Sequence, residues 1–309
     1  MPAQLAQMPI HDRFDLQSWI ARFQLEDLRT QAREFVLKRR DEMPRDYPSE
    51  ADVDRHIQLM EPRGEILVGP GSLAVNEQLR AEAFRGSHYR GARVATDVFV
   101  WARGEPPNPA MTKIGGVPYR PRSSPWPRDR EGKPVRFIAQ LCFADSRDIL
   151  GDLPGDVLLI YGDDDSLLVE PERLAFEWSS LGIGELAFEV PKIAASERLT
   201  PYYGVIHRTG DWPDVLEEIP GRYRCPWLLS VFEGTKIGGL PRFIQDEPTV
   251  AGRFLCALGS ISANYSAYPL INESERRGWS DGDLMIGDMG SLYLFLDPQG
   301  RVRAESQCY

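Results

Sequence analysis

Three consecutive carboxylates, Asp163, Asp164 and Asp165, give this sequence its plainest opportunity for metal chemistry. Mg²⁺ and Ca²⁺ prefer such hard oxygen ligands. The aspartates follow the apolar run 157–161 after one glycine, however, and aspartate is common in the turn that ends a buried strand. The spacing of a calcium loop and its distal glutamate are also missing. We therefore interpret the cluster as a solvated turn and keep a metal site as the alternative.

Two lysines lie in a phrase that occurs twice. Residues 112–118 read Thr-Lys-Ile-Gly-Gly-Val-Pro and residues 235–241 read Thr-Lys-Ile-Gly-Gly-Leu-Pro, which places Lys113 and Lys236 at equivalent positions. A lysine beside successive backbone N–H groups is one way to bind an anion. No Ser or Thr follows the glycines and no helix pattern begins there, so a phosphate loop is not supported. Paired glycines before a proline indicate a structured turn at a strand.

The loop that follows the first phrase, residues 119–134, is rich in basic residues and contains Trp126, and we call it the basic loop. Residues 113–136 carry seven basic residues against two acidic ones, whereas residues 145–189 carry twelve acidic residues against two basic ones. The two segments either form one polarised surface or cancel in space, and the sequence leaves both open. Arginine and aromatic side chains are typical anchors of protein interfaces. The candidate binding residues are Lys113, Arg120, Arg122, Trp126, Arg128, Lys236 and Asp288.

Composition and charge argue against several classes of protein. A net charge of −10 and a pI near 5.1 argue against a duplex nucleic acid partner, because that binding depends on neutralising phosphates. No run approaches the roughly 18 to 20 apolar residues of a membrane span, and no signal-peptide layout is present. The four cysteines are scattered, so neither a zinc site nor a disulfide framework is indicated. We expect a soluble, cytoplasmic protein with reduced thiols and no cofactor.

The pattern of apolar residues predicts a helical segment followed by strands. Spacings of three and four predict helices over residues 15–36, 49–60 and 72–84. At Arg93 the period changes to two, which predicts a strand over residues 94–101. Further strands are expected over residues 135–143, 156–161 and 202–206, and in the second half over residues 253–258 and 291–296.

The order of phrase and strands in the first half returns in the second, which predicts an internal duplication. The expected fold is α+β, with two pseudo-symmetric sheet-containing repeats packed together. The repeats would occupy about residues 93–210 and 211–309. Together they would form one domain, residues 93–309, preceded by the N-terminal helical segment, residues 1–92.

Several motifs appear together in a fixed order. They are Lys-Ile-Gly-Gly-Val-Pro at 113–118, Trp-Pro at 126–127, Phe-Ile-Ala-Gln-Leu at 137–141, Leu-Leu-Ile-Tyr-Gly-Asp-Asp-Asp at 158–165, Lys-Ile-Gly-Gly-Leu-Pro at 236–241 and Gly-Asp-Met-Gly-Ser-Leu-Tyr at 287–293. As a set, over roughly residues 94–296, they resemble the YwqG-like family of bacterial proteins, a domain of unknown function. The resemblance implies a duplicated α+β fold with no established reaction. Some members are thought to lie beside toxin genes, so it also implies an immunity role as a hypothesis.

Three functional hypotheses follow. The first is a non-catalytic protein-interaction module whose partner is a protein such as a cognate toxin. The second is a metal-dependent enzyme with a cleft between the repeats that uses Asp163–Asp165 or Asp288. The third is a scaffold that self-associates through its N-terminal helices. No G-x-S-x-G, H-E-x-x-H or Cys/His set is present, and His207 has no nucleophile motif beside it, so we favour binding over catalysis. The oligomeric state is left open.

Overall fold

The computed structural model describes residues 9–11, 13, 89–90, 92–163, 167, 170–191, 199–215, 230–248, 250–261 and 282–309. The chain forms two compact units. The larger consists of Met1–Phe14, Ala95–Thr209 and Glu233–Tyr309, and the smaller consists of Asp15–Val94 and Gly210–Phe232. In the described part of the smaller unit, β1 (Tyr89–Arg90) pairs antiparallel with β8 (Asp214–Val215).

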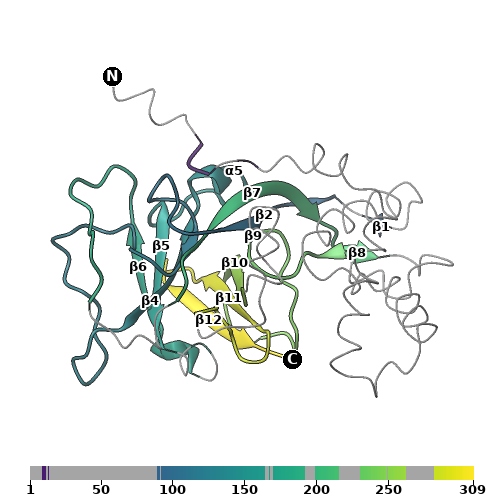
Figure 1. Cartoon of the computed structure of the whole chain (residues 1–309). Helices are drawn as coiled ribbons and strands as arrows, with labels where there is room; N and C mark the ends of the chain where they lie inside the picture. The colour runs from purple at the N-terminus through teal and green to yellow at the C-terminus, as the bar shows by residue number, and fades with distance from the viewer. Residues whose placement is uncertain are drawn as a thin grey trace, which may run out of the picture. The chain divides into compact units, whose positions relative to one another are not determined.

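The larger unit is built on a ten-stranded sheet (Figure 1). Its strands are β2 (Val94–Arg103), β3 (Lys113–Ile114), β4 (Arg136–Cys142), β5 (Val157–Gly162), β6 (Ala175–Ser179), β7 (Tyr202–Asp211), β9 (Lys236–Gly238), β10 (Arg253–Gly259), β11 (Ser291–Leu296) and β12 (Val302–Gln307). Their order across the sheet is β12-β11-β10-β9-β2-β7-β3-β4-β5-β6. The helices of the described residues are short: η3 (Ala144–Ser146), α5 (Arg147–Leu150) and η4 (Pro171–Arg173).

At strand β5 both faces of the sheet are covered by buried side chains. Leu158 and Ile160 belong to one buried cluster, whereas Leu159 and Tyr161 belong to another. All four are fully buried. An unbroken apolar run is the pattern of a strand with no solvated face, and this run has that pattern. The second cluster fills the space between β4, β5 and the loops that cover them, which include the basic loop after the first glycine pair.

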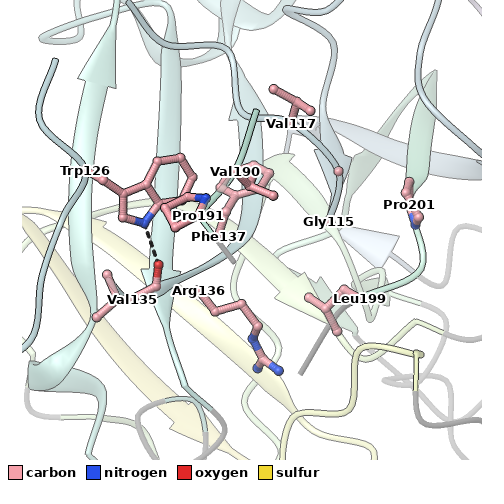
Figure 2. Close-up of a pocket in the computed structure, with 11 residues that line it drawn as sticks. Gly115, Val117, Trp126, Val135, Arg136, Phe137, Val190, Pro191, Leu199 and Pro201 are labelled. Atoms are coloured by element: carbon pink, nitrogen blue, oxygen red, sulfur yellow. Dashed lines mark hydrogen bonds between the residues drawn. The ribbon is translucent and has the colours of Figure 1, made fainter. Parts of the chain in front are cut away.

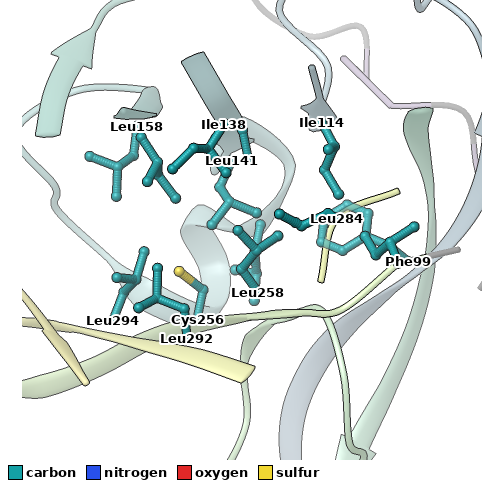
Figure 3. Close-up of a cluster of buried hydrophobic side chains, with 14 of the residues drawn as sticks. Phe99, Ile114, Ile138, Leu141, Leu158, Cys256, Leu258, Leu284, Leu292 and Leu294 are labelled. Atoms are coloured by element: carbon teal, nitrogen blue, oxygen red, sulfur yellow. The ribbon is translucent and has the colours of Figure 1, made fainter. Parts of the chain in front are cut away.

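The first buried cluster is shared by both ends of the sheet. Ile138 and Leu141 of β4 lie in the same cluster as Leu258 of β10 and Leu292 of β11 (Figure 3). The sheet is therefore curled into a nearly closed, barrel-like form around one interior. At the β12 edge, the hydroxyl of Ser306 donates to the carbonyl of Leu167, so this edge is tied to the connection that follows β5.

The predicted α+β fold of two packed repeats is wrong. The described residues are mostly β, and the strands expected to form two repeats lie in one sheet. Strand β2, from the start of the domain, pairs with β9 from the second half, with Asp97 opposite Ile237. Strand β7, at the end of the first predicted repeat, lies between β2 and β3, with Tyr203 opposite Lys113 of β3. A repeated phrase specifies local backbone dihedrals, but it does not specify which strand becomes the neighbour.

The local geometry of the two phrases is nevertheless the same. Gly115 and Gly116 have φ values of 61° and 70°, and Gly238 and Gly239 have φ values of 67° and 70°. These values lie in the left-handed region that glycine enters without steric cost. The prediction of a structured turn at a strand is confirmed at both places, because β3 and β9 lead directly into the turns.

The three predicted N-terminal helices, over residues 15–36, 49–60 and 72–84, lie outside the described residues. The described residues of the 1–92 segment are not helical. His11 is buried in the larger unit, Arg13 forms a parallel bridge with Ile206, and β1 is a strand. The prediction that residues 1–92 form a helical segment is therefore wrong for the residues of that segment that the structure describes.

The predicted strands are confirmed as β2, β4, β5, β7, β10 and β11, with end positions that differ by a few residues. Strands β6 and β12 were not predicted. None of the described helices has the length and apolarity that a membrane crossing requires.

Candidate functional site

A cavity of about 360 Å³ lies beside the first glycine-pair turn (Figure 2). The residues that line it come from the turn, the basic loop, the start of β4 and the segments on either side of residues 192–198. They are Gly115, Gly116, Val117, Trp126, Val135, Arg136, Phe137, Val190, Pro191, Leu199 and Pro201. Its lining is mostly apolar, and a small number of polar groups in an apolar pocket is typical of sites for small ligands.

The turn that forms one wall is held by Glu105. One carboxylate oxygen of Glu105 accepts from Nζ of Lys113 at 2.8 Å, and the other accepts from the backbone N–H of Val117 at 3.0 Å. A Cβ on Gly116 would lie 1.8 Å from Glu105 Oε1. Glycine is favoured at this position by its positive φ, and an added Cβ would have to displace the Glu105 carboxylate.

The opposite wall is aromatic and is fixed in place. The indole Nε1–H of Trp126 donates to the carbonyl of Val135 at 2.7 Å (Figure 2). The rings of Trp126 and Phe137 both pack edge-on against Tyr161, with centroid distances of 5.5 Å and 5.6 Å. Such pairs favour a defined ring orientation. Trp126 and Phe137 therefore form a rigid surface before any ligand arrives.

Arg136 is the charged side chain among the described residues that line the cavity. It is 9% exposed and extends between Val135 and Leu199 (Figure 2). A guanidinium is a planar donor that suits carboxylates and phosphates. Across the cavity, the carbonyl of Pro201 accepts from the backbone N–H of Gly104 at 2.7 Å, which fixes that wall.

The candidate residues Arg120 and Trp126 lie together. The Arg120 side chain is 3% exposed, forms an ion pair with Glu177 at 3.1 Å and donates to the carbonyls of Ser124 and Pro125. Its guanidinium lies over the Trp126 ring, 5.2 Å from the centroid. The buried Arg120 side chain thus stabilises the conformation of the basic loop. Its ion pair with Glu177 also joins the basic segment to the acidic segment.

Arg122 and Arg128 are exposed on the same loop. The Arg122 guanidinium lies over the Phe188 ring at 4.5 Å, and Phe188 is 58% exposed. Arg128 donates to the carbonyl of Gly132, four residues along the loop. Backbone hydrogen bonds from Arg122 to Glu185 and from Ala187 to Arg120 join this loop to the segment 185–191.

The two lysines of the repeated phrase are both buried. Burial lowers the pKa of Lys113, and the Glu105 carboxylate opposes part of that shift. Lys236 in β9 donates to the carbonyl of Leu240. The second turn differs in its surroundings, because a Cβ on Gly238 would lie 2.4 Å from Cγ2 of Ile149 in α5. Ile149 therefore packs against the second turn, whereas Leu199 packs against Gly115 at the first.

The acidic candidates do not gather into one site among the described residues. Asp163 forms an ion pair with Arg173 at 3.1 Å, and Asp164 and Asp165 lie outside the described residues. Asp288 is exposed, and its backbone carbonyl accepts from Tyr309. The described part of the chain contains no group of three or more His, Cys, Asp or Glu arranged to hold a metal ion.

The two buried thiols among the described residues are not activated. Cys142 and Cys256 are free and buried. Burial raises the pKa of Cys142 to about 12 and also raises that of Cys256. Because the thiolate is the nucleophile, neither sulfur is prepared for covalent catalysis.

Sequence reasoning missed a buried polar network that anchors the N-terminal residues. The ring of His11 contacts Asp145 through Nδ1 at 2.9 Å and accepts the backbone N–H of Thr112 at Nε2, also at 2.9 Å. The Thr112 hydroxyl in turn accepts the backbone N–H of Cys142 at 3.0 Å. His11 lies over 100 positions from both partners, so no local spacing could have indicated the contact.

Gln140 is a second residue that sequence reasoning passed over. It is fully buried, accepts from the backbone N–H of Tyr119 and donates to the carbonyls of Pro109 and Met111. A glutamine inside an apolar strand run is a signal for such a network, because a buried amide needs partners. Through these bonds Gln140 holds the beginning of the basic loop against β4.

A family model described as "Domain of unknown function (DUF1963)" matches residues 112–175. The matched range begins at the first glycine-pair turn and ends at the start of β6, so it contains Trp126, Arg136 and Phe137. This part of the chain is similar to a family of uncharacterised domains. The comparison with curated proteins found no match.

Proposed function

We propose that this chain is a non-catalytic protein-interaction module that recognises its partner through the basic loop and the segment 185–191. The observation that carries the proposal is the pair formed by Arg122 and Phe188. Phe188 is a large apolar side chain that is 58% exposed, and it is held under a guanidinium 4.5 Å away. Exposed aromatic and arginine side chains in one place are the usual energetic centre of a protein interface.

The pair is carried by an ordered backbone. The N–H of Arg122 donates to Glu185 at 2.9 Å, and the N–H of Ala187 donates to Arg120 at 2.9 Å. Val190, which is 40% exposed, extends the apolar surface beside Phe188. An interface residue that is already fixed loses little conformational entropy on binding. The fitting partner is a protein with an apolar depression for Phe188 and a carboxylate beside it for Arg122.

The resemblance to the YwqG-like family supports a more specific form of this proposal. In that form the protein is bacterial and cytoplasmic, and it neutralises a cognate toxin. The metal-dependent enzyme remains the alternative hypothesis, but Asp163 is paired with Arg173 and no further observation on the described residues favours it.

Cross-linking in the source cells, followed by mass spectrometry, would identify the partner, and binding would then be measured with the purified partner. We expect Phe188→Asp and Arg122→Glu each to weaken the partner's affinity by about tenfold or more, as at other interface centres. Their melting temperatures should stay close to that of the parent protein. The matched control is Met285→Asp, because Met285 is also an exposed apolar residue, at 39%. Unchanged affinity in both loop variants would refute the proposal.

A further inference from the structure

We propose that the cavity beside the Gly115–Gly116 turn binds a small, uncharged aromatic molecule of one or two rings, which packs against Trp126 and Phe137. This ligand differs from the protein partner proposed above, and its binding does not depend on that partner. The size of the cavity, its fixed walls, its aromatic side chains and the charge of its lining each support the assignment.

The size of the cavity suits a small molecule. Its volume of about 360 Å³ lies near the lower end of the range of roughly 300 to 1,000 Å³ that such sites occupy. Valine, proline and leucine side chains supply most of the lining that is not aromatic. An apolar molecule that enters this space loses its contact with water, which is the main favourable contribution to its binding.

The wall formed by residues 199–201 is held in place before a ligand arrives (Figure 2). The N–H of Thr200 donates to the carbonyl of Gly282 at 2.7 Å. The carbonyl of Pro201 accepts from the N–H of Gly104, also at 2.7 Å. Because this wall is already ordered, little conformational entropy is lost when a ligand packs against it.

The aromatic side chains of the lining indicate an aromatic ligand. Trp126 is fixed by its hydrogen bond to Val135, and both Trp126 and Phe137 pack edge-on against Tyr161. Contacts between aromatic rings stabilise a complex beyond the effect of the area that they bury. A saturated molecule of the same size would gain only from the burial of its surface.

The charge of the lining indicates an uncharged ligand. Arg136 is the charged residue among the described residues that line the cavity, and it already takes part in an interaction of its own. An ionised ligand would have to leave water for a mainly apolar space without a partner reserved for its charge, which is costly. A neutral molecule avoids that cost and leaves the interaction of Arg136 in place.

The test uses the whole purified protein and naphthol, whose binding is measured by ligand-detected nuclear magnetic resonance. We expect saturable binding of one naphthol molecule for each chain. Decahydronaphthol has the same ring skeleton without aromaticity, and it should bind about three- to tenfold more weakly because it lacks the ring contacts. Naphthoate, which is ionised at neutral pH, should bind at least about tenfold more weakly than naphthol.

A change of one aromatic wall residue tests the ring contacts. Phe137→Leu should reduce the preference for naphthol over decahydronaphthol by about twofold or more. Phe254→Leu is the matched control, because the Phe254 ring also packs edge-on, against Phe295 with a centroid distance of 5.8 Å, but is not part of the cavity lining. This control should bind both compounds like the parent protein.

A second variant keeps the test decisive if Phe137→Leu fails to fold. Val117→Trp should fill the cavity and abolish saturable naphthol binding, because only the side chain changes and the backbone bond to Glu105 can remain. Phe188→Asp should retain naphthol binding, so a failure of the protein-interaction proposal would be visible separately.

Four results would overturn the proposal. They are the absence of saturable naphthol binding in the parent protein, naphthoate binding as tight as that of naphthol, an unchanged preference in folded Phe137→Leu, and undiminished naphthol binding in Val117→Trp.

Discussion

Nδ1 of His11 lies 2.9 Å from Oδ2 of Asp145, and this contact fastens the N-terminal residues to the larger unit. Because Nε2 accepts the N–H of Thr112, the ring proton is assigned to Nδ1, which donates to the carboxylate. The same carboxylate accepts the backbone N–H groups of Ile10 and His11. Asp145 therefore holds both the ring and the main chain of this segment.

Replacement of His11 by alanine should lower the free energy of unfolding by about 2 to 4 kcal/mol. The loss comes from the Thr112 N–H, which would be left buried without its acceptor, and from the space vacated by a fully buried ring. Urea denaturation would measure it. A matched change at an exposed position, Arg13→Ala, should cost less, and a His11→Ala loss below about 0.5 kcal/mol would contradict the anchoring role.

The contribution of Asp145 should depend on pH in one direction. Burial alone would raise the pKa of Asp145, but the hydrogen bonds from the His11 ring and from the His11 and Ile10 N–H groups outweigh it and lower that pKa. A carboxyl with a lowered pKa stabilises the fold above its ordinary value and loses that contribution as the pH falls through the folded value. The stability difference between the parent protein and Asp145→Asn should therefore be constant near neutral pH and shrink below about pH 4. A difference that grows on acidification would contradict this assignment.

Gly116→Ala should be more damaging than a change at another left-handed glycine. The new Cβ would lie 1.8 Å from Glu105 Oε1 and displace the carboxylate from Lys113 and Val117. Gly132 is the matched control, because its φ is 79° and no atom lies within 4 Å of its added Cβ. We expect Gly132→Ala to cost about 1 kcal/mol and Gly116→Ala about 2 to 4 kcal/mol, as measured by thermal or urea unfolding. Equal costs would show that Glu105 is not held at the turn.

The titration of Lys113 should change the free energy of unfolding at alkaline pH. Burial lowers its pKa, with Glu105 opposing, so the unfolded chain binds more protons than the folded chain between the folded value and 10.5. Stability should therefore rise with pH in that window. Relative to Lys113→Met, the parent protein should gain stability as the pH rises from the lowered folded pKa of Lys113 towards 10.5. A relative loss would mean that the Glu105 pair outweighs burial.

Metal binding gives a further check on the aspartate cluster. We expect titration calorimetry with Mg²⁺, Ca²⁺ and Mn²⁺ to give no saturable heat, because Asp163 already pairs with Arg173. Arg173→Ala provides the sharper test, since it releases Asp163 from that contact. Saturable heat in the parent protein that disappears in Asp163→Asn would restore the metal-dependent enzyme as the leading hypothesis.

The sequence predicted strands best where one segment carried its own pattern. The unbroken apolar run of β5 was sufficient because that strand is buried on both faces. The alternation of β-branched residues in β2 was also sufficient, although residues 96–102 are all buried. Which strands pair with each other in the sheet could not be predicted from the sequence. Nothing near Asp97 indicates that Ile237 will lie opposite it, and the α+β repeat prediction failed on that point.

The candidate site was predicted in part for a similar reason. Trp126 was selected from residue type, and it does line the cavity. Arg120 was selected on the same grounds, yet its side chain is buried and stabilises the basic loop, because it forms an ion pair with Glu177. Phe188 and Leu199 are far from the basic loop in sequence, so residue spacing gave no sign of them. Arg136 was counted among the basic residues, but its burial in an apolar wall is visible only in the fold.

The pairing of β2 with β9 has a consequence for how the chain reaches its native state. Asp97 and Ile237 are 140 positions apart, so the middle of the sheet cannot close during synthesis until most of the polypeptide has left the ribosome. Loop closure over such a separation slows folding. Until then the β2 edge is an open template for other strands, and fragments that stop before Lys236 should aggregate rather than fold.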